Sequence, residues 1–295
     1  MQPGSTSQRC SSSSAALALL VLTGCAERDA PGRDATKRAP AVAATESELV
    51  VFAAASLREA FDALGKELER SRPGVRVRIS YAGSQVLRAQ LEQGAAADLI
   101  AAAAPEELAP LVAQRRVAAP RVFAHNELVI AKPKGVVAPS DLRALPECER
   151  IVIGAESVPV GRYARRMLER ADGAFGAGFA ARVMSAVVSQ EPNTRLVLAK
   201  VSLGEADAGI VYRTDALAAA SMVDTVAIPA ELNQRAEYVV AEVNGRAHPE
   251  LAAAFVALAT SVQGRALLQR FGFLAATESA GRARDATSVR AGAAR

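Results

Sequence analysis

Short runs of β-branched and other apolar residues alternate along this chain with longer segments that carry Ala, Leu, Glu and Arg at helical spacing. Such alternation is typical of βα units, which build mostly parallel sheets covered by helices. A length of 295 residues suits two α/β lobes, each of somewhat more than about a hundred residues. The expected strands are Leu49–Ala53, Val75–Ser80, Asp98–Ala102, Glu127–Ala131, Ile151–Gly154, Ala208–Tyr212, Val223–Ala227 and Glu237–Val243. The expected helices are Leu57–Ser71, Gln85–Gln93, Ala164–Glu169, Ala177–Val187, Arg195–Leu203, Pro249–Val262 and Gly264–Phe271.

Composition and charge exclude several classes of protein. A hydrophobic content of 51% with 22% charged residues excludes a disordered chain. No apolar run approaches the roughly 20 residues that a membrane-spanning helix needs. Three of the four net positive charges fall in residues 1–24 and 276–295, and the chain contains no Trp. We therefore expect a soluble globular protein without the basic, aromatic groove that nucleic-acid binding requires.

The first residues indicate export. Arg9 precedes the apolar stretch Ala15–Thr23, which has the length of a signal-peptide core. The following segment, Leu22–Cys25, resembles a bacterial lipobox, in which Cys25 is lipidated and becomes the new N-terminus after cleavage. An ordinary signal peptide, with Cys25 incidental, is the alternative. We predict a lipoprotein signal peptide at 1–24, a flexible tether at 25–47 and a disordered tail at 276–295, with the protein held at the membrane through Cys25 alone.

The remaining cysteines predict no disulfide. Cys10 leaves with the signal peptide, and Cys25 is committed to lipid, so Cys148 has no partner. Acidic neighbours disfavour its thiolate, which makes a reactive role for Cys148 a poor hypothesis.

Two serines follow neighbouring expected strands at turns that lead directly into helices. Ser56 follows the first strand, and Ser84 follows the second. As N-caps, they would bring hydroxyl donors, main-chain amides and positive helix ends to one place, which is where open α/β sheets hold ligands. The alternative is that each serine is simply a good helix cap.

Three further segments add donors of the same kind. Ser157–Tyr163 presents the amides of Val160 and Gly161 at a helix start. Gln190–Arg195 offers Asn193 as a cap with the amide of Thr194 behind it, and Gly209–Asp215 ends a strand on the phenol of Tyr212.

The segments most specific to one family are Ala53–Leu57, Gly94–Leu99, Val158–Ala164, Gly209–Tyr212 and Arg270–Phe273. Through them, the stretch from about Leu49 to Leu274 resembles the periplasmic molybdate-binding proteins of ABC transporters. The resemblance implies a type II periplasmic-binding fold, in which two α/β lobes enclose the ligand. It also implies that Ser56 and Ser84 donate from one lobe.

From the other lobe, the resemblance implies the backbone amides of Val160 and Thr194 and the hydroxyl of Tyr212. A tetrahedral oxyanion would lie between the two sets. The chain departs from the family pattern at Ala101–Pro105, where serine and acidic or amide residues are frequent, and at Thr194, where an aliphatic residue is frequent.

The physical character of these groups agrees with the resemblance. Molybdate carries no proton near neutral pH, so its oxygens only accept hydrogen bonds, and a site made of donors satisfies them. Phosphate retains a proton and would want an acceptor, yet Asp98 and Glu106 are more simply a strand-end and a helix-start residue. Sulfate is also fully deprotonated and stays open. Ferric binding fits poorly, because Tyr212 is isolated among the mapped positions.

An enzyme is the competing class. His125 and His248 follow no pattern that couples them to a serine, and we interpret both as surface histidines. The chain has no Gly-x-Ser-x-Gly elbow and no phosphate-binding Gly-x-x-x-x-Gly-Lys-Ser/Thr loop. ATP hydrolysis for transport would therefore come from another subunit.

We expect lobe I at 48–126 and 238–275 and lobe II at 127–237, with Glu237–Ala241 as the second hinge crossing. The predicted function is that of a monomeric extracytoplasmic solute-binding lipoprotein, not an enzyme. It captures molybdate or tungstate, without a cofactor, for the permease and ATPase subunits of an ABC importer. A receptor for another small oxyanion such as sulfate is the alternative, and an enzyme of unknown class is a more distant one.

Overall fold

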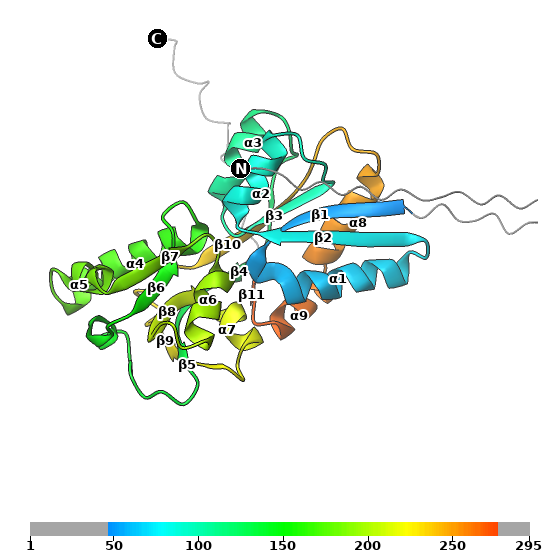
Figure 1. The fold of residues 1–295 in the computed structure, drawn as a ribbon. Coiled ribbons are helices and arrows are strands. Elements are labelled where there is room, and N and C mark those ends of the chain that lie inside the picture. The colour runs from blue at the N-terminus through cyan, green and yellow to red at the C-terminus, as the bar shows by residue number, and fades with distance from the viewer. Residues whose placement is uncertain (1–46, 277–295) are drawn as a thin grey trace, which may run out of the picture. The chain divides into compact units, whose positions relative to one another are not determined.

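The computed structural model describes residues 47–276, which form two β-sheets with helices packed against them (Figure 1). The expected signal peptide 1–24, the lipidation site Cys25 and almost all of the expected tether and tail lie outside the described residues.

The first sheet has six strands in the order β11-β4-β10-β3-β1-β2. Strand β1 pairs in parallel with β2 and β3, whereas β10 runs antiparallel to β3 and β4, and β11 antiparallel to β4. The strand bounds are β1 Ser47–Ala54, β2 Val75–Ala82, β3 Leu99–Ala102, β4 Arg121–Asn126, β10 Ala236–Glu242 and β11 Leu274–Ala275.

Helices cover both faces of this sheet because its strands alternate apolar side chains between the two faces. Val51 of β1 packs in the core that α1, α8 and α9 cover, whereas Phe52 packs in the core formed with α2 and α3. These helices are α1 Arg58–Ser71, α2 Ser84–Glu92, α3 Ala109–Ala113, α8 Pro249–Thr260 and α9 Val262–Arg270, with short 3₁₀ turns η1 Ala55–Leu57 and η2 Pro105–Glu107.

The second sheet has five strands in the order β7-β6-β8-β5-β9. Helices α4 and α5 pack on one face, and α6 and α7 on the other. The strands are β5 Leu128–Pro133, β6 Ile151–Gly154, β7 Val187–Glu191, β8 Ala208–Tyr212 and β9 Val223–Ala227. The helices are α4 Pro159–Phe175, α5 Phe179–Ser185, α6 Thr194–Ser202 and α7 Arg213–Ala218, and η3 Leu145–Glu147 is a 3₁₀ turn.

The chain crosses between the sheets twice, at adjacent places. It leaves the six-stranded sheet after Asn126, the last residue of β4, and it returns at Ala236, the first residue of β10. Asn126 and Ala236 face each other in the β4–β10 pairing. Apolar packing continues through this region, since Leu128 of β5 and Tyr238 of β10 belong to one buried cluster.

The mixed α/β class is confirmed, and most expected elements are present. Strand β4 was not expected, because Arg121–Asn126 carries Arg, His and Asn and becomes a strand by pairing with β10 and β11. The expected helix Ala177–Val187 ends at Ser185, and Val187 begins β7 beside β6. Helix α4 begins at Pro159 rather than Ala164, because Pro is favourable in the first turn of a helix.

Within residues 47–276, no single helix is long and apolar enough to cross a membrane. The bent pair α8 and α9, at 65° to each other, meets the length and composition criteria only when taken together. Helix α8 buries Leu251, Phe255 and Val256 in the core of the six-stranded sheet.

Candidate functional site

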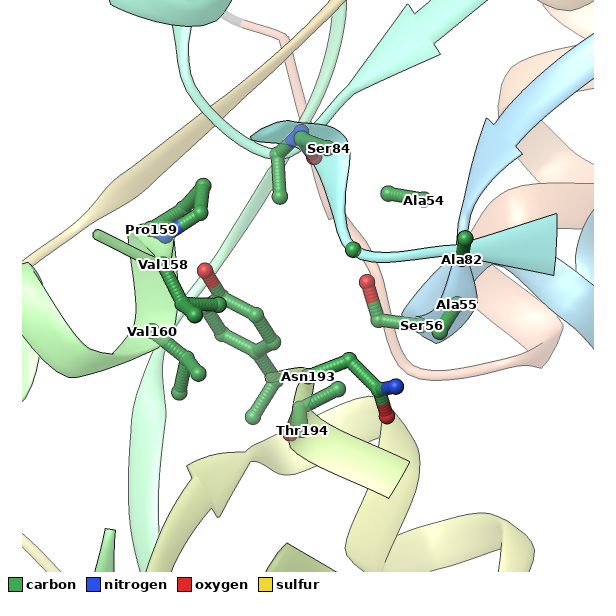
Figure 2. Close-up of a pocket in the computed structure, with 13 residues that line it drawn as sticks. Ala54, Ala55, Ser56, Ala82, Ser84, Val158, Pro159, Val160, Asn193 and Thr194 are labelled. Atoms are coloured by element: carbon green, nitrogen blue, oxygen red, sulfur yellow. The ribbon is translucent and has the colours of Figure 1, made fainter. Parts of the chain in front are cut away.

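A pocket lies between the two sheets, where several strands end and helices begin (Figure 2). It holds about 230 Å³ of empty space, including the part open to solvent, so it suits a small ligand of a few heavy atoms. The pocket is lined by Ala54, Ala55, Ser56, Ala82, Gly83, Ser84, Ala103, Val158, Pro159, Val160, Asn193, Thr194 and Tyr212.

All five residues expected to bind the ligand line this pocket. Ser56 and Ser84 reach it from the six-stranded sheet, and Val160, Thr194 and Tyr212 reach it from the five-stranded sheet. Each is almost fully buried, and Figure 2 shows the labelled members of the set around one space. The structure therefore brings together five residues that span 157 positions of the sequence, from residue 56 to residue 212.

Neither serine caps a helix, so the expected N-caps are wrong. Ser56 lies inside the 3₁₀ turn η1, and its Oγ is 2.7 Å from the hydroxyl oxygen of Tyr238. Ser84 is the first residue of α2 behind the N-cap Gly83, and its Oγ accepts a hydrogen bond from the amide of Ala103 at 3.1 Å. Both hydroxyls are held by groups distant in sequence, because the turns after β1 and β2 already place these residues in helical geometry.

The start of α4 offers main-chain amides that no helix carbonyl accepts, and one of these residues, Val160, lines the pocket. Along α4, the amide of Arg162 is the first that donates a hydrogen bond to a helix carbonyl. Its acceptor is the carbonyl oxygen of Val158, at 3.0 Å. The preceding amides of Val160 and Gly161 are first-turn donors with no intrahelical acceptor, at the positive end of the helix dipole. Such a helix start is suited to an anion.

Gly161 allows this helix start to approach the end of β6. A Cβ atom at position 161 would lie 2.0 Å from the carbonyl oxygen of Ala155 and 2.3 Å from that of Gly154. Any side chain would therefore push the first turn of α4 away from the strand. This glycine determines where the amide of Val160 lies.

Helix α6 repeats the arrangement. Asn193 caps it as expected, and its Oδ1 accepts from the amide of Leu196 at 3.1 Å. The next amide bonds to the carbonyl of Asn193 at 3.4 Å, which leaves the amides of Thr194 and Arg195 without an intrahelical acceptor. The Thr194 hydroxyl is engaged elsewhere, because it donates to Oδ2 of Asp215 at 2.9 Å. The main-chain amide of Thr194, rather than its hydroxyl, is therefore the group that can donate to a ligand in the pocket.

Tyr212 adds a phenol from the end of β8. Its hydroxyl is buried and has no hydrogen-bond partner among the described residues. Burial raises the pKa of Tyr212 well above its usual value, so the group keeps its proton and can donate. A buried donor without a partner is costly unless a ligand satisfies it.

Among the residues that the structure describes, no charged side chain lines the pocket, but a charged cluster lies directly behind Thr194. Asp215 is fully buried, and burial raises its pKa to about 6 against the opposing effects of Arg195 and Thr194. The Nε of Arg195 lies 2.6 Å from Oδ1 of Asp215, as an ion pair without hydrogen-bond alignment. Arg195 also donates to Glu59 of α1, on the other side of the pocket.

Polar contacts around the pocket join elements of one sheet to elements of the other. Besides Arg195 with Glu59, Arg162 of α4 donates to Glu107 of η2 at 2.6 Å. The side chain of Gln85 donates to the carbonyl oxygen of Pro192 at 2.9 Å. The pocket is thus enclosed by contacts that a separation of the two sheets would break.

The structure also shows where other residues considered in the sequence analysis lie. Asp98 does not line the pocket, and its Oδ2 accepts from the amide of Val50 at 2.7 Å. Glu106 lies in η2, also outside the lining. His125 is only 6% exposed, so its interpretation as a surface residue is wrong; burial in β4 lowers its pKa. Cys148 is buried and has no disulfide partner among the described residues.

Sequence reasoning missed the tyrosine cluster behind the pocket. The rings of Tyr212 and Tyr238 pack edge to face with centroids 5.7 Å apart. Among the described residues that line the pocket, Tyr212 is still the one tyrosine, as expected. Within the described residues, no three His, Cys, Asp or Glu side chains are grouped as metal ligands. Tyr238 has no local sequence signal, because its link to Ser56 spans 182 positions.

Comparison with known proteins agrees with this geometry. A family model described as bacterial extracellular solute-binding protein matches residues 49–274. The molybdate-binding protein ModA of Mycobacterium tuberculosis is 36% identical over 230 residues, covering 76% of this chain and 84% of that protein. A putative ABC transporter substrate-binding lipoprotein of Bacillus subtilis, YvgL, is 28% identical over 262 residues, covering 88% and 95%.

Solved structures confirm the expected periplasmic-binding fold. The periplasmic molybdate-binding protein of Azotobacter vinelandii matches with a TM-score of 0.68 at 19% identity, covering 78% of this chain and all of that one. The sulfate-binding protein SubI of Mycobacterium tuberculosis matches with a TM-score of 0.67 at 20% identity, covering 77% and 86%. On the extent of the family match and the identity to its relatives, this chain belongs to the bacterial extracellular solute-binding proteins.

Proposed function

We propose that this protein binds molybdate or tungstate in the pocket between its two sheets and delivers the ion to an ABC importer. The observation that carries the proposal is a pocket lined by hydrogen-bond donors from both sheets and, within residues 47–276, by no charged side chain. The molybdate-binding names of relatives up to 36% identical support it.

The donors match the chemistry of a fully deprotonated oxyanion. The hydroxyls of Ser56, Ser84 and Tyr212 and the amides of Val160 and Thr194 all lie at the pocket. Tetrahedral oxyanions without a proton only accept, so each donor finds a lone pair. Hydrogen bonds to a charged group contribute roughly 1.5–3 kcal/mol each, and helix starts add a favourable field.

Sulfate is the second candidate ligand, because it is also fully deprotonated and the sulfate-binding protein SubI shares the fold. Phosphate is disfavoured, because it carries a proton at neutral pH and no carboxylate lines the pocket. Selection between molybdate, tungstate and sulfate would then depend on the size of the cavity.

We infer that the molecule opens and closes as two lobes, 48–126 with 238–275 and 127–237. The two crossings at Asn126 and Ala236 would form the hinge. Since each side supplies only part of the donor set, the ion makes all its contacts only when the lobes are together. Ligand binding would therefore shift the population toward the closed form.

The family description, bacterial extracellular solute-binding protein, supports a location outside the cytoplasm and a binding rather than a catalytic role. We propose permease and ATPase subunits as partners, a monomeric state and no cofactor. We also propose a lipid on Cys25 as the membrane anchor, which the lipoprotein name of the Bacillus subtilis relative supports.

Calorimetry on residues 26–295 tests the ligand assignment. Titration with molybdate, tungstate, sulfate and phosphate at pH 7.5 should give tight binding of molybdate and tungstate, weaker binding of sulfate and none of phosphate. Tight binding of phosphate, or no heat with any of the four ions, would contradict the proposal.

A further inference from the structure

Ser56 lines the pocket, yet its hydroxyl is already in a hydrogen bond. Its Oγ lies 2.7 Å from the hydroxyl oxygen of Tyr238, and either oxygen could be the donor by distance alone. The direction matters, because a serine that donates to Tyr238 has no proton left for an oxyanion. A serine that accepts from Tyr238 keeps its proton for the ligand.

The contacts of Asn126 determine which hydroxyl donates in the hydrogen bond between Ser56 and Tyr238. Its Oδ1 accepts from the amide of Glu127 at 3.0 Å, and a main-chain amide can only donate. The orientation of the carboxamide is therefore fixed. Its Nδ2 must be the atom that donates to Oγ1 of Thr214 at 2.9 Å and, in a longer hydrogen bond of 3.4 Å, to the hydroxyl of Tyr238.

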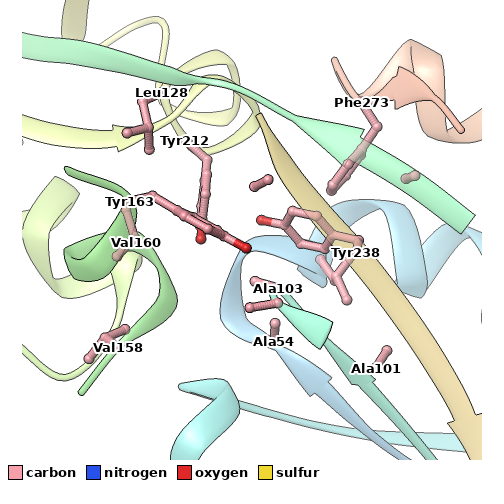
Figure 3. Close-up of a cluster of buried hydrophobic side chains, with 14 of the residues drawn as sticks. Ala54, Ala101, Ala103, Leu128, Val158, Val160, Tyr163, Tyr212, Tyr238 and Phe273 are labelled. Atoms are coloured by element: carbon pink, nitrogen blue, oxygen red, sulfur yellow. The ribbon is translucent and has the colours of Figure 1, made fainter. Parts of the chain in front are cut away.

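The hydroxyl oxygen of Tyr238 accepts a hydrogen bond from Nδ2 of Asn126. Its own proton is therefore available to donate to Oγ of Ser56. Burial raises the pKa of Tyr238 well above its usual value, so that proton is always present. Figure 3 shows the phenol of Tyr238 reaching from β10 toward the space near Tyr212. Its ring is fixed edge to face against Phe123, Tyr212 and Phe273. The proton of Ser56 is then left for the pocket.

The hydroxyl of Ser84 is also held as an acceptor by the protein, so its proton is free for the ligand, but here a main-chain amide does this directly. Its Oγ accepts directly from the amide of Ala103, which cannot reverse. Ser56 has no such amide and depends on the side-chain relay from Asn126 through Tyr238.

We propose that Asn126 and Tyr238 are positioning residues that hold Ser56 as an obligate hydrogen-bond donor, so that the pocket discriminates against oxyanions that carry a proton. This inference rests on the proposed oxyanion function. It also ties a ligand contact to the hinge, because Asn126 ends β4 and contacts both Thr214 of α7 and Tyr238 of β10.

A double-mutant cycle tests the relay. Calorimetry with molybdate compares the parent, Tyr238→Phe, Ser56→Ala and the double variant. Tyr238→Phe keeps the packed ring and removes only the relay hydroxyl, and it should lower molybdate affinity about fivefold to tenfold. In the Ser56→Ala background the same change should have almost no effect, because it acts only through Ser56.

Tyr81→Phe is the matched control. It removes a phenol hydroxyl that bonds to Arg58 and Asp62, outside the pocket lining, and it should leave affinity unchanged. An equal loss from Tyr238→Phe with and without Ser56 would mean that the Tyr238 hydroxyl acts on the ligand by a route other than Ser56, and it would overturn the relay. No loss in either background would overturn it as well.

Selectivity gives a second measurement. Without Tyr238 as donor, Ser56 can rotate and accept from a protonated phosphate, so the ratio of molybdate to phosphate affinity should fall about fivefold or more in Tyr238→Phe. Asn126→Asp should also reduce molybdate affinity, since a carboxylate accepts the hydrogen bond of the Tyr238 hydroxyl, and Ser56 must then donate to Tyr238 rather than to the ion. An unchanged ratio in Tyr238→Phe would overturn the inference. A parent that binds no oxyanion would overturn the proposed function itself, which is a distinct result.

Discussion

The two sides of the pocket supply the same kind of group in different ways. The six-stranded side presents the side-chain hydroxyls of Ser56 and Ser84, each oriented by a buried partner. The five-stranded side presents mainly main-chain amides at the starts of α4 and α6, with Tyr212 as its single hydroxyl. Function on the first side should therefore depend on side-chain identity. On the second side it should depend on backbone position, which glycine and helix caps control.

The largest effect is expected from Gly161→Ala. The added methyl group would meet the carbonyl oxygens of Ala155 and Gly154 at 2.0 and 2.3 Å and displace the first turn of α4 with its amides. Loss of the Val160 amide, a charge-assisted donor, together with the displaced helix start corresponds to about a hundredfold loss of molybdate affinity. Calorimetry measures the affinity, and thermal unfolding measures the accompanying loss of stability.

Gly173→Ala is the matched control in the same helix. Nothing lies within 4 Å of a Cβ at position 173, so the change should leave affinity intact and stabilise α4 by about 0.5–1 kcal/mol. If Gly161→Ala bound molybdate as tightly as Gly173→Ala, the amides of α4 would not contact the ion. The claim that the five-stranded side binds through its backbone would then be wrong.

Ser84→Ala should have the next largest effect. It removes one hydroxyl donor and should weaken molybdate binding about tenfold to a hundredfold. Fold stability should fall by about 1–3 kcal/mol, because the buried amide of Ala103 loses its partner. Ser185→Ala, whose exposed hydroxyl bonds to the carbonyl of Arg182, controls for the chemical change. Parental affinity in Ser84→Ala would refute a ligand role for this serine.

Gly83→Ala should show a smaller effect that arises from closure. Gly83 has φ −62° and ψ 140°, which alanine adopts readily, so the local backbone tolerates the change. A Cβ there would lie 2.4 Å from the carbonyl oxygen of Pro192, across the contact between the two sides. We expect about tenfold weaker binding, with small-angle scattering showing a larger radius of gyration at saturating molybdate than in the parent. A closed, tightly binding Gly83→Ala would show that this approach does not limit closure.

The sequence predicted the parts of the site that depend on local order. Ser56 and Ser84 follow strands, Tyr212 ends one, and Asn193 precedes a helical segment. Their places could therefore be inferred from strand and helix patterns alone. The partners of these residues could not, because Tyr238, Asn126 and Ala103 come to the pocket through sheet pairing between distant segments. The predicted caps failed for the same reason, since tertiary partners rather than helix amides hold both serines.

The burial of His125 and the existence of β4 were equally beyond local reasoning. A segment of mixed polarity becomes a buried strand only when β10 and β11 pair with it on either side. Fold class was predictable because it depends on periodicity over many residues, whereas the hinge region depends on a few long-range pairings.

The central claim is that one oxyanion lies between the two sides and accepts from both. A crystal structure with bound molybdate, located by the anomalous scattering of molybdenum, tests it most directly. The account predicts one strong anomalous peak in the pocket. Its oxygens should lie within hydrogen-bonding distance of the Ser56, Ser84 and Tyr212 hydroxyls and of the Val160 and Thr194 amides. A peak at another place, or an ion held by only one side with the other withdrawn, would contradict the account.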